Sequence, residues 1–335
     1  MNHSHPRTFA LLTKLANKNK VDLQALNVDN LLEDLCVRIR LKVAFANSPT
    51  KIEIDIPKVL NDNSGNVKRI FNCFSFWIPF CLEILDRRGH SFSLCLNASD
   101  WGHVDFLSMT SIDQNNIIPD EYAMFESQRI SNFNGWNSFE QFSKRWLYRK
   151  GIVYWRGSTT GDPITSIKSL ENLKRIQVSL LYRNKVGFNI RISNIVQNKI
   201  PKQIIRQWLY QQDLKGKKVR EDYFRKFKYY PDIPGNNLMC GSWGTIRKLL
   251  RGNLVFKPNH PSKMLYDEML EPWNNFIPVD SDFSELGKLY AWVEDNQNDA
   301  VKIAWRGYSM ANNYLRNLKN HFINSAVQKL ERLES

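Results

Sequence analysis

The stretch Ile152-Val-Tyr-Trp-Arg156-Gly-Ser-Thr-Thr-Gly161 indicates the fold most directly. Four apolar residues make a short strand, which runs straight into a loop of one arginine, three hydroxyl residues and two glycines. A run with helical spacing follows. An apolar strand that leads through a small-residue loop into a helix is typical of α/β proteins, in which helices cover both faces of a parallel sheet.

The same alternation of strands and helices extends in both directions from this stretch. Short apolar or alternating runs predict strands at 51–56, 91–96, 106–109, 152–155, 188–192, 227–230 and 254–256. Apolar residues at helical spacing predict helices at 7–17, 28–38, 66–87, 138–150, 164–183, 202–211, 244–251 and from 283 onward. Residues 112–136 are rich in turn formers. We therefore expect two α/β units with parallel sheets that meet near residue 150, with ligands at the carboxyl ends of strands and between the units.

Length and composition narrow the class of protein. A chain of 335 residues with 42% hydrophobic and 24% charged residues is long enough for two folded domains, which excludes disordered, collagen-like and coiled-coil classes. No apolar run reaches the ~18 residues that span a membrane, and the N-terminus lacks the apolar core of a signal peptide. The five cysteines form no CxxC pair and the six histidines show no ligand spacing, so we expect reduced thiols, a cytoplasmic location and no metal site.

The positive charge is concentrated in the middle of the chain. The formal net charge is +14, and residues 141–230 alone hold 21 Lys and Arg against 5 Asp and Glu. This excess predicts an anionic partner: nucleic acid, a phosphorylated small molecule or an acidic membrane surface. The densest run, Lys215-Gly-Lys-Lys-Val-Arg220, fits contact with phosphates or lipid headgroups, and equally a solvated loop.

Three loops that follow strands carry candidate chemistry. In Ser99-Asp100-Trp-Gly102 a carboxylate leaves a buried strand, either as a turn former or as a general base. The loop 156–161 offers backbone N–H groups, hydroxyls and the Arg156 fork to an anion, or forms an ordinary turn; no Walker GK[ST] follows it. The loop from Pro234 to Gly244 leads into a helix with Arg247 in its first turn, which fits a phosphate at the helix start or a plain N-cap.

A further short pattern, Asp280-Ser-Asp282, has the D-x-D form of metal-nucleotide motifs in one class of glycosyltransferases. Because Phe283-Ser-Glu-Leu286 follows, the second carboxylate also fits the N-cap of a helix. Both readings stay open at this point.

Several segments stand in a characteristic order over about two-thirds of the chain. They are Leu94–Trp101, Tyr154–Thr160, Phe227-Lys-Tyr-Tyr-Pro-Asp232-Ile-Pro-Gly235-Asn236, Gly241-Ser-Trp-Gly-Thr-Ile-Arg247-Lys-Leu-Leu250, Leu254-Val-Phe-Lys257, Leu270-Glu-Pro-Trp273, Ile277-Pro-Val279 and Ala304-Trp-Arg-Gly307. In this order they resemble the motifs of glycosyltransferase family 90, the capsule-associated-protein type that includes the Rumi-type protein O-glucosyltransferases. The resemblance is weakest before residue 90.

The resemblance implies an α/β fold of the GT-B type, with two Rossmann-like lobes, a cleft between them and a helical C-terminus. Residues 1–150 would form the acceptor-side lobe, 151–305 the nucleotide-sugar lobe, and 306–335 a helix that packs back toward the first lobe. The activity implied is transfer of a sugar of the glucose or xylose class from a UDP-sugar to a hydroxyl of a glycan, lipopolysaccharide or protein acceptor. The transfer would be inverting and metal-independent, with no cofactor.

The resemblance also assigns roles to individual residues. Asp100 would be the catalytic base that deprotonates the acceptor hydroxyl. The donor-binding residues would be Arg156, Ser158, Asp232, Gly235, Asn236, Ser242, Trp243, Gly244, Thr245 and Arg247, with Arg156 and Arg247 clamping one diphosphate. Met264 and Asn275 depart from the family pattern, where Glu and His are usual, which leaves the identity of the donor sugar open. Rumi-type enzymes are secretory and disulfide-bonded, and this sequence shows neither trait, so bacterial members that modify lipopolysaccharide or capsule glycans are the closer functional model.

Two rival functions stay open. A non-catalytic nucleic-acid-binding protein is favoured by the basic middle of the chain and the aromatic residues interspersed in it: Trp146, Tyr148, Trp155, Tyr182, Trp208 and Tyr210. A metal-dependent GT-A transferase would use Asp280 and Asp282. On the enzyme reading we expect no nucleic-acid partner, and the basic surface would allow peripheral contact with an anionic membrane that holds a lipid-linked acceptor.

Overall fold

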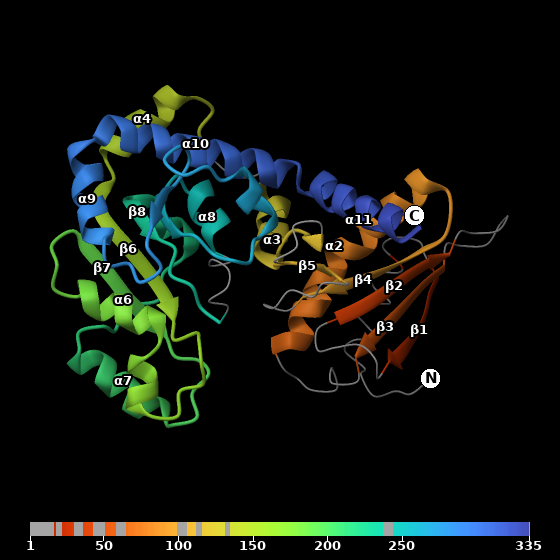
Figure 1. Ribbon diagram of the computed structural model, residues 1–335, viewed down its shortest axis with the longest axis horizontal. Coiled ribbons are helices and arrows are strands. Elements are labelled where there is room, and N and C mark those ends of the chain that lie inside the picture. The colour runs from red at the N-terminus through yellow and green to blue at the C-terminus, as the bar shows by residue number, and fades with distance from the viewer. Residues whose placement is uncertain are drawn as a thin grey trace. The chain divides into compact units, whose positions relative to one another are not determined.

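The structure, a computed structural model, describes residues 17, 22–29, 36–42, 51–57, 65–98, 106–111, 116–130, 135–236 and 244–334 (Figure 1). The chain divides into two compact units. Unit 1 comprises residues 1–128, 262–265 and 316–335, and unit 2 comprises residues 129–261 and 266–315. The first boundary between the units therefore falls after Gln128, whereas the sequence predicts it near residue 150.

Unit 1 contains a mixed five-stranded sheet. Its strands are β1 (Asp22–Asp29), β2 (Cys36–Lys42), β3 (Lys51–Pro57), β4 (Phe92–Asn97) and β5 (Leu107–Ser108), in the order β1-β3-β2-β4-β5. The two outer pairs are parallel, but β2 runs antiparallel to both of its neighbours. The strands predicted at 51–56, 91–96 and 106–109 are confirmed, whereas the expectation of a parallel sheet is wrong for this unit.

The helix predicted at 28–38 is also wrong, since residues 22–29 and 36–42 are strands. Apolar residues at 28, 31, 32 and 35 have helical spacing, but Val37, Ile39 and Leu41 alternate with arginines and are buried in the sheet. Pairing with β3 and β4 therefore decides the local structure, as tertiary context often does for a short apolar run. The helix expected at 7–17 lies, except for Asn17, outside the described residues.

Three helices whose bounds are described lie in unit 1: α2 (Gly65–Arg88), α3 (Glu121–Arg129, whose last residue falls in unit 2) and α11 (Leu318–Glu334). The prediction at 66–87 is confirmed by α2. Helix α11 packs against α2: the rings of Phe80 and Phe322 lie 5.2 Å apart, and Glu83 pairs with Lys319 at 2.8 Å. Residues 306–335, predicted as one helix that packs back toward the first lobe, are divided between the units: residues up to Leu315 belong to unit 2 and residues from Arg316 onward belong to unit 1.

Helix α3 lies in a region that the sequence analysis took for turns. Its start is fixed by Asp120, whose carboxylate accepts hydrogen bonds from the backbone N–H groups of Tyr122 and Ala123 at 2.9 and 3.0 Å. That carboxyl group is fully buried. Burial raises its pKa to about 7, although the same backbone bonds act to lower it.

Unit 2 contains a parallel five-stranded sheet. Its strands are β6 (Lys150–Ser158), β7 (Phe188–Asn194), β8 (Phe227–Pro231), β9 (Leu254–Pro258) and β10 (Ile277–Val279), in the order β10-β9-β8-β6-β7. Every pair is parallel. All five residues of β9 are buried, as expected for a strand covered on both faces. The α/β fold with a parallel sheet is thus confirmed for this unit, and of its strands only β10 was not predicted.

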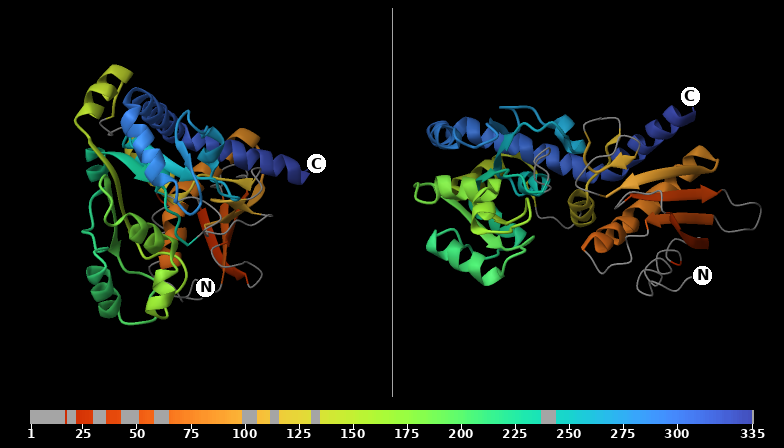
Figure 2. Two further views of the ribbon diagram at one scale, coloured as in Figure 1. Left: turned by 60° about the vertical axis from the view of Figure 1, so that its left-hand side comes forward. Right: turned by 60° about the horizontal axis from the view of Figure 1, so that its bottom comes forward.

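Most helices of unit 2 lie where the sequence predicts them, although the helix predicted at 164–183 is divided into two and the short helices at 221–226 and 265–269 were not predicted. The helices are α4 (Phe139–Leu147), α5 (Ile167–Glu171), α6 (Lys174–Tyr182), α7 (Lys202–Gln211), η4 (Glu221–Lys226), α8 (Thr245–Leu250), α9 (Leu286–Asp295) and α10 (Gln297–Arg316), and η5 (Leu265–Met269) lies at a junction of the units. The last helices of the chain, α9, α10 and α11, are blue in Figure 2.

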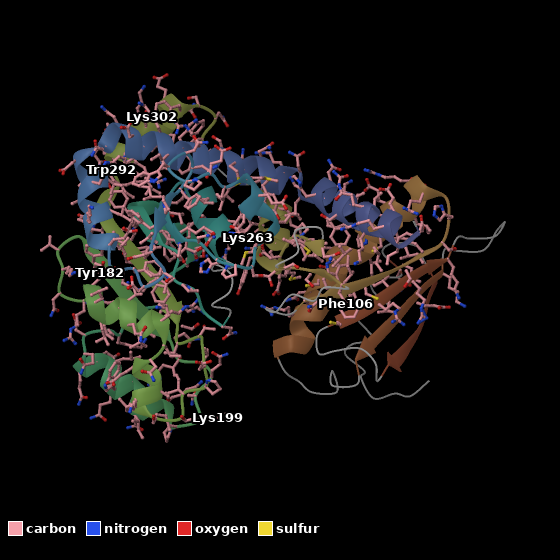
Figure 3. All side chains as sticks on the ribbon, viewed as in Figure 1. Phe106, Tyr182, Lys199, Lys263, Trp292 and Lys302 are labelled. Carbon is pink, nitrogen blue, oxygen red and sulfur yellow. The ribbon has the colours of Figure 1, made fainter. Side chains whose placement is uncertain are left out.

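Successive residues of β6 point to opposite faces of the unit 2 sheet. Tyr154 stacks on Phe227 with ring centroids 3.9 Å apart, while Trp155 lies under the guanidinium of Arg175 in α6. Helix α6 is anchored by Tyr182, labelled in Figure 3, whose hydroxyl donates to the carbonyl of Phe283 at 2.7 Å. Helices thus cover both faces of the sheet and leave its two edges, where the strands begin and end, for the loops.

Candidate functional site

The strand order of unit 2 reverses at β6. The chain goes from β6 to β7 on one side, then crosses to β8 on the other side, and continues outward to β9 and β10. In doubly wound sheets the crevice beyond the carboxyl ends of the strands at such a reversal is the usual ligand site. Here those ends carry the loops after Ser158 and after Pro231.

The side chain of Arg175 joins the two loops. Its Nη1 donates to the hydroxyl of Thr160 at 2.9 Å and to the carbonyl of Ser158 at 3.1 Å, and its Nε donates to the carbonyl of Pro234 at 3.1 Å. The hydroxyls of Ser158 and Thr160 are hydrogen-bonded to each other. A fixed guanidinium and two hydroxyls therefore meet at the carboxyl ends of β6 and β8.

Gly235 comes closest to this guanidinium. A Cβ at position 235 would lie 2.8 Å from Nη2 of Arg175 and 3.3 Å from Cβ of Thr160. Any side chain larger than hydrogen would have to displace the arginine. The absence of a side chain at position 235 therefore lets the backbone of the loop after β8 lie close to the guanidinium of Arg175.

A third loop, which follows β7, contacts the other two loops through the side chain of Gln197. Its side-chain amide donates to Oδ1 of Asn236 at 2.6 Å and accepts from the N–H of Gly161 at 2.9 Å. The backbone of Gln197 is left-handed, with φ of 56°. Thr159 supports the same loop, since its hydroxyl donates to the carbonyl of Val196 and accepts from its N–H, both at 2.9 Å. Asp232 lies fully buried below this edge, and its N–H donates to the carbonyl of Phe256 at 2.8 Å.

Arg156 turns toward β7 rather than toward the β8 loop. Its Nη1 and Nη2 donate to the carbonyl and the side-chain oxygen of Asn189 at 2.9 and 2.7 Å, and its guanidinium lies over the ring of Tyr154 at 4.2 Å. Gly216 packs against it so closely that a Cβ there would come within 2.7 Å of Nε. Burial lowers the pKa of Arg156 below its ordinary value.

Arg247 is directed to a carboxylate of η4. Its Nη2 lies 3.1 Å from Oε2 of Glu221, and the buried Lys248 pairs with the other oxygen of the same carboxylate. Burial acts to raise the pKa of Glu221, but Lys248 and Arg247 together lower it below its ordinary value. Burial also lowers the pKa of Lys248, to about 8, against the opposing effect of Glu221.

The start of α8 gives a partial picture of the other predicted donor residues. Gly244 precedes the helix with helical dihedral angles and no side-chain cap. Thr245 is fully buried, and its hydroxyl has no hydrogen-bond partner among the described residues. Ser242 and Trp243, like the predicted base Asp100, lie outside the described residues.

Arg175 and Gln197 were not among the predicted site residues. The sequence analysis took 164–183 for one helix, but the structure ends α5 at Glu171 and begins α6 at Lys174. This break places Arg175 in a first helical turn beside the ends of β6 and β8. The signal was present, because Asn172 is a good helix terminator and an arginine follows it by three residues.

The remaining candidates have structural roles in the described residues. Asp280 accepts from the hydroxyl of Ser284 at 2.5 Å and Asp282 from its N–H at 2.8 Å, so both carboxylates bond to residues at the start of α9. Asn275, one of the two departures, bonds through its side chain to the backbone of Glu271 and Met269, each at 2.9 Å.

Three of the six aromatic residues named in the basic region are buried and unavailable for stacking on a ligand. Trp146, Trp155 and Tyr182 are at most 2% exposed, whereas Tyr148 and Tyr210 are 86% and 65% exposed. The nucleic-acid alternative was based on the basic middle of the chain together with these rings, so the part of its support that comes from the rings is weaker than the sequence indicated. None of the helices in the described part of the chain has the length and apolar character to cross a membrane.

Comparison with known proteins gives a family match. The model of glycosyl transferase family 90 matches residues 135–322. Uncharacterized protein 027R of Frog virus 3 (isolate Goorha) is 28% identical over 185 residues, 51% of this chain and 18% of that protein. Protein O-glucosyltransferase 3 of Homo sapiens is 30% identical over 95 residues, 28% of this chain and 18% of that protein. The matched parts thus span less than a fifth of each relative's length.

A solved structure of HepE from Anabaena in complex with UDP-glucose is 12% identical and superposes with a TM-score of 0.35, covering 60% of this chain and 56% of that chain. A likeness of this size bears on neither the fold nor the ligand. The matched family segment includes every described residue of the switch-point cluster, which we define as Ser158, Thr160, Arg175, Gln197, Gly235 and Asn236.

Proposed function

Because this chain belongs to glycosyl transferase family 90, as the resemblance of its motifs predicted, we propose that it transfers a sugar from a UDP-sugar to a hydroxyl of an acceptor. The sugar is of the glucose or xylose class, and the acceptor is a glycan, lipopolysaccharide or protein. The proposed architecture is GT-B, with the nucleotide sugar bound by unit 2.

The observation that carries the proposal is the position of Arg175 at the switch point. Its guanidinium holds the hydroxyl loop after β6 against the glycine-bearing loop after β8. A diphosphate bound there would accept hydrogen bonds from the hydroxyls and from the guanidinium, with Gly235 allowing its close approach. The Gln197–Asn236 pair beside it offers amide groups for hydroxyls of the ligand.

The other predicted donor residues remain part of the proposed site, but two of its arginines are bound to other side chains. Arg247 would have to leave Glu221, or share it, to reach a diphosphate. Arg156 would have to release Asn189. We therefore propose Arg175 as the principal cation of the donor site, with Arg156, Asp232, Ser242, Trp243, Gly244, Thr245 and Arg247 as its surroundings.

The proposed reaction is an inverting displacement. Asp100 accepts the proton of the acceptor hydroxyl while that oxygen attacks the anomeric carbon from the face opposite to UDP. The bond between the anomeric carbon and the diphosphate oxygen breaks, and UDP leaves with the electron pair. Fixed cations and N–H groups stabilise the charge that develops on the leaving diphosphate. Independence from metal is part of this proposal.

Location and acceptor also remain proposals. A cytoplasmic protein in peripheral contact with an anionic membrane would meet a lipid-linked acceptor there, and the charge of +14 favours such contact.

Titration calorimetry with UDP tests the donor site. Arg175→Lys keeps the charge but removes the planar fork, so we expect its UDP affinity to fall by about 10–100-fold. Arg183→Lys is the matched control, because Arg183 follows the last turn of the same helix and donates to Gln212 at 2.6 Å. Thermal unfolding of both variants separates a binding loss from a folding defect. Unchanged UDP affinity in Arg175→Lys contradicts the proposed site.

A further inference from the structure

Unit 2 has a cavity at the edge opposite to the switch point. Its volume is about 670 Å³, which falls within the range of small-molecule sites. It is lined by Gly135, Trp136, Gln141, Lys144, Arg145, Tyr148, Arg149, Arg225 and Lys226. Helix α4 and Arg149 immediately precede β6, and Arg225 and Lys226 immediately precede β8 (Figure 1). The cavity therefore lies where these strands begin, whereas the switch-point cluster lies where they end.

The lining is strongly basic. Five of its nine residues are Lys or Arg, and none is Asp or Glu. Two carboxylates act on these cations from outside the lining: Glu140 pairs with Lys144 at 2.7 Å, and the charge of Asp222 acts on Arg225. No carboxylate of the described residues lies within ion-pair distance of Arg145, Arg149 or Lys226.

Arg149 is the feature that distinguishes this cavity from a solvated basic surface. It is only 8% exposed. Its Nη1 and Nη2 donate to the carbonyls of Gly252 and Arg251 at 2.6 and 2.9 Å. Burial and the neighbouring Arg225 lower its pKa to about 9. A buried cation without a counter-ion is costly, and a bound anion would relieve that cost.

The geometry around Arg149 is fixed by packing. Trp136 lies between two guanidiniums, with its ring centroid 5.0 Å from Cζ of Arg149 and 4.7 Å from Cζ of Arg225. Its backbone N–H donates to the hydroxyl of Tyr308 at 2.9 Å. Gly252, at φ of 73°, has room for no Cβ, which would meet Phe142 at 2.6 Å and Arg149 at 3.0 Å. The guanidiniums of Arg149 and Arg225 are therefore held against Trp136 before any ligand arrives, whereas Lys144, Arg145 and Lys226 are exposed.

We propose that this cavity binds an anion that carries two or more phosphate groups. After the two outlying carboxylates are counted, the five lining cations leave an excess of three positive charges. One phosphate monoester carries about −1.5 to −2 at neutral pH, so it leaves the excess incompletely neutralised, whereas two or three linked phosphates balance it. The same chemistry occurs in a free polyphosphorylated molecule and in the headgroup of a phosphorylated lipid.

This site is independent of the proposed sugar transfer, because it uses none of the residues of the switch-point cluster. Occupancy at the start of β6 and β8 would stabilise the strands whose other ends hold that cluster. The proposal concerns binding and stability, and it requires no covalent step.

Titration calorimetry with inorganic tripolyphosphate tests the proposal on the full chain. The informative variant is Arg145→Gln with Lys226→Gln, because both side chains line the cavity and neither has an ion-pair partner among the described residues. The matched control is Lys202→Gln with Arg206→Gln, which removes one Lys and one Arg from the exposed face of α7 in the same unit. Arg175→Lys serves as the donor-site control.

We expect the cavity variant to weaken tripolyphosphate binding by at least about tenfold for each residue replaced, while the α7 control stays within twofold of the unmodified chain and Arg175→Lys loses only the binding at the proposed donor site. Tripolyphosphate should also raise the melting temperature of the unmodified chain, and raise that of the cavity variant by less. Equal losses in the cavity and α7 variants would show general charge attraction and overturn the proposal. Loss only in Arg175→Lys, or no binding at all, overturns it as well.

Sedimentation with vesicles distinguishes the two sources of the ligand. One set consists of phosphatidylcholine, and the other contains in addition a phosphatidylinositol bisphosphate. Vesicle binding that depends on Arg145 and Lys226 supports the cavity with a lipid headgroup as its ligand. Tripolyphosphate binding by the same residues without vesicle binding supports it with a free ligand. If neither probe depends on these residues, the cavity is not an anion site.

Discussion

Replacing Gly235 by alanine should weaken the proposed donor site without unfolding the protein. The new Cβ would lie 2.8 Å from Nη2 and 3.1 Å from Cζ of Arg175. Because carbon atoms rarely come closer than 3.4 Å to such neighbours, the guanidinium must move by about 0.6 Å. Its bonds to Pro234 and Ser158, both 3.1 Å long, are strained by such a shift, and lengthening by the same 0.6 Å would take either beyond the length of a hydrogen bond.

The size of the effect follows from the bonds at stake. A hydrogen bond to a charged group contributes about 1.5–3 kcal/mol, so the loss of one such bond to the diphosphate corresponds to about a 10–150-fold loss of UDP affinity. The fold itself should change little, because the clash is with the end of a flexible side chain. Chemical denaturation should place the loss of stability at about 1 kcal/mol.

Calorimetry with UDP measures the affinity, and Gly287→Ala provides the control. A Cβ at position 287 has its nearest neighbour, a ring carbon of Tyr182, at 3.7 Å, so alanine fits there and should stabilise α9. Combining Gly235→Ala with Arg175→Lys should cost less than the sum of the two single changes, since both act on the same guanidinium. If Gly235→Ala binds UDP as tightly as the unmodified chain, the reasoning is wrong.

Two further outcomes are expected. Asp100→Asn should reduce turnover by about 10²–10⁴-fold while leaving UDP affinity unchanged, and a variant that transfers sugar at the unmodified rate would remove Asp100 from the base role. Asp120→Asn should gain stability relative to the unmodified chain as pH rises from 5 to 8, as measured by urea unfolding. The folded-state pKa of Asp120, about 7, exceeds the unfolded value of 3.8. The folded unmodified chain therefore binds more protons than the unfolded chain in that window, and its free energy of unfolding falls as pH rises. A difference in stability that stays constant over this pH range would show that burial does not raise the pKa of the Asp120 carboxyl group.

The sequence predicted the architecture of unit 2 well because its signals are local. Most strands there contain a short apolar block, and several helices have clear ends, as at 202–211, where prediction and structure agree, although the break between α5 and α6 was missed. Unit 1 was predicted less well. The alternation of Val37, Ile39 and Leu41 with arginines is a local strand signal that the prediction of a helix at 28–38 missed, whereas the antiparallel pairing of this strand with β3 and β4 is visible in no local window.

The site was predicted in part for a similar reason. Ser158, Gly235 and Asn236 follow strands directly, so their place at the sheet edge could be derived from the chain order. The direction of a long side chain could not. Arg156 turns to Asn189 and Arg247 to Glu221, while Arg175, from a helix start that the sequence analysis overlooked, spans the crevice.

The discontinuous make-up of unit 1 has a consequence for how the protein is made. Helix α11 packs on α2, yet some 230 residues separate the two in the chain, including all of unit 2. During translation the apolar face of α2 around Phe80 must wait, uncovered, until Phe322 has left the ribosome. The later-made unit can thus finish folding first, and a fragment released before α11 would expose that face to chaperones or to aggregation.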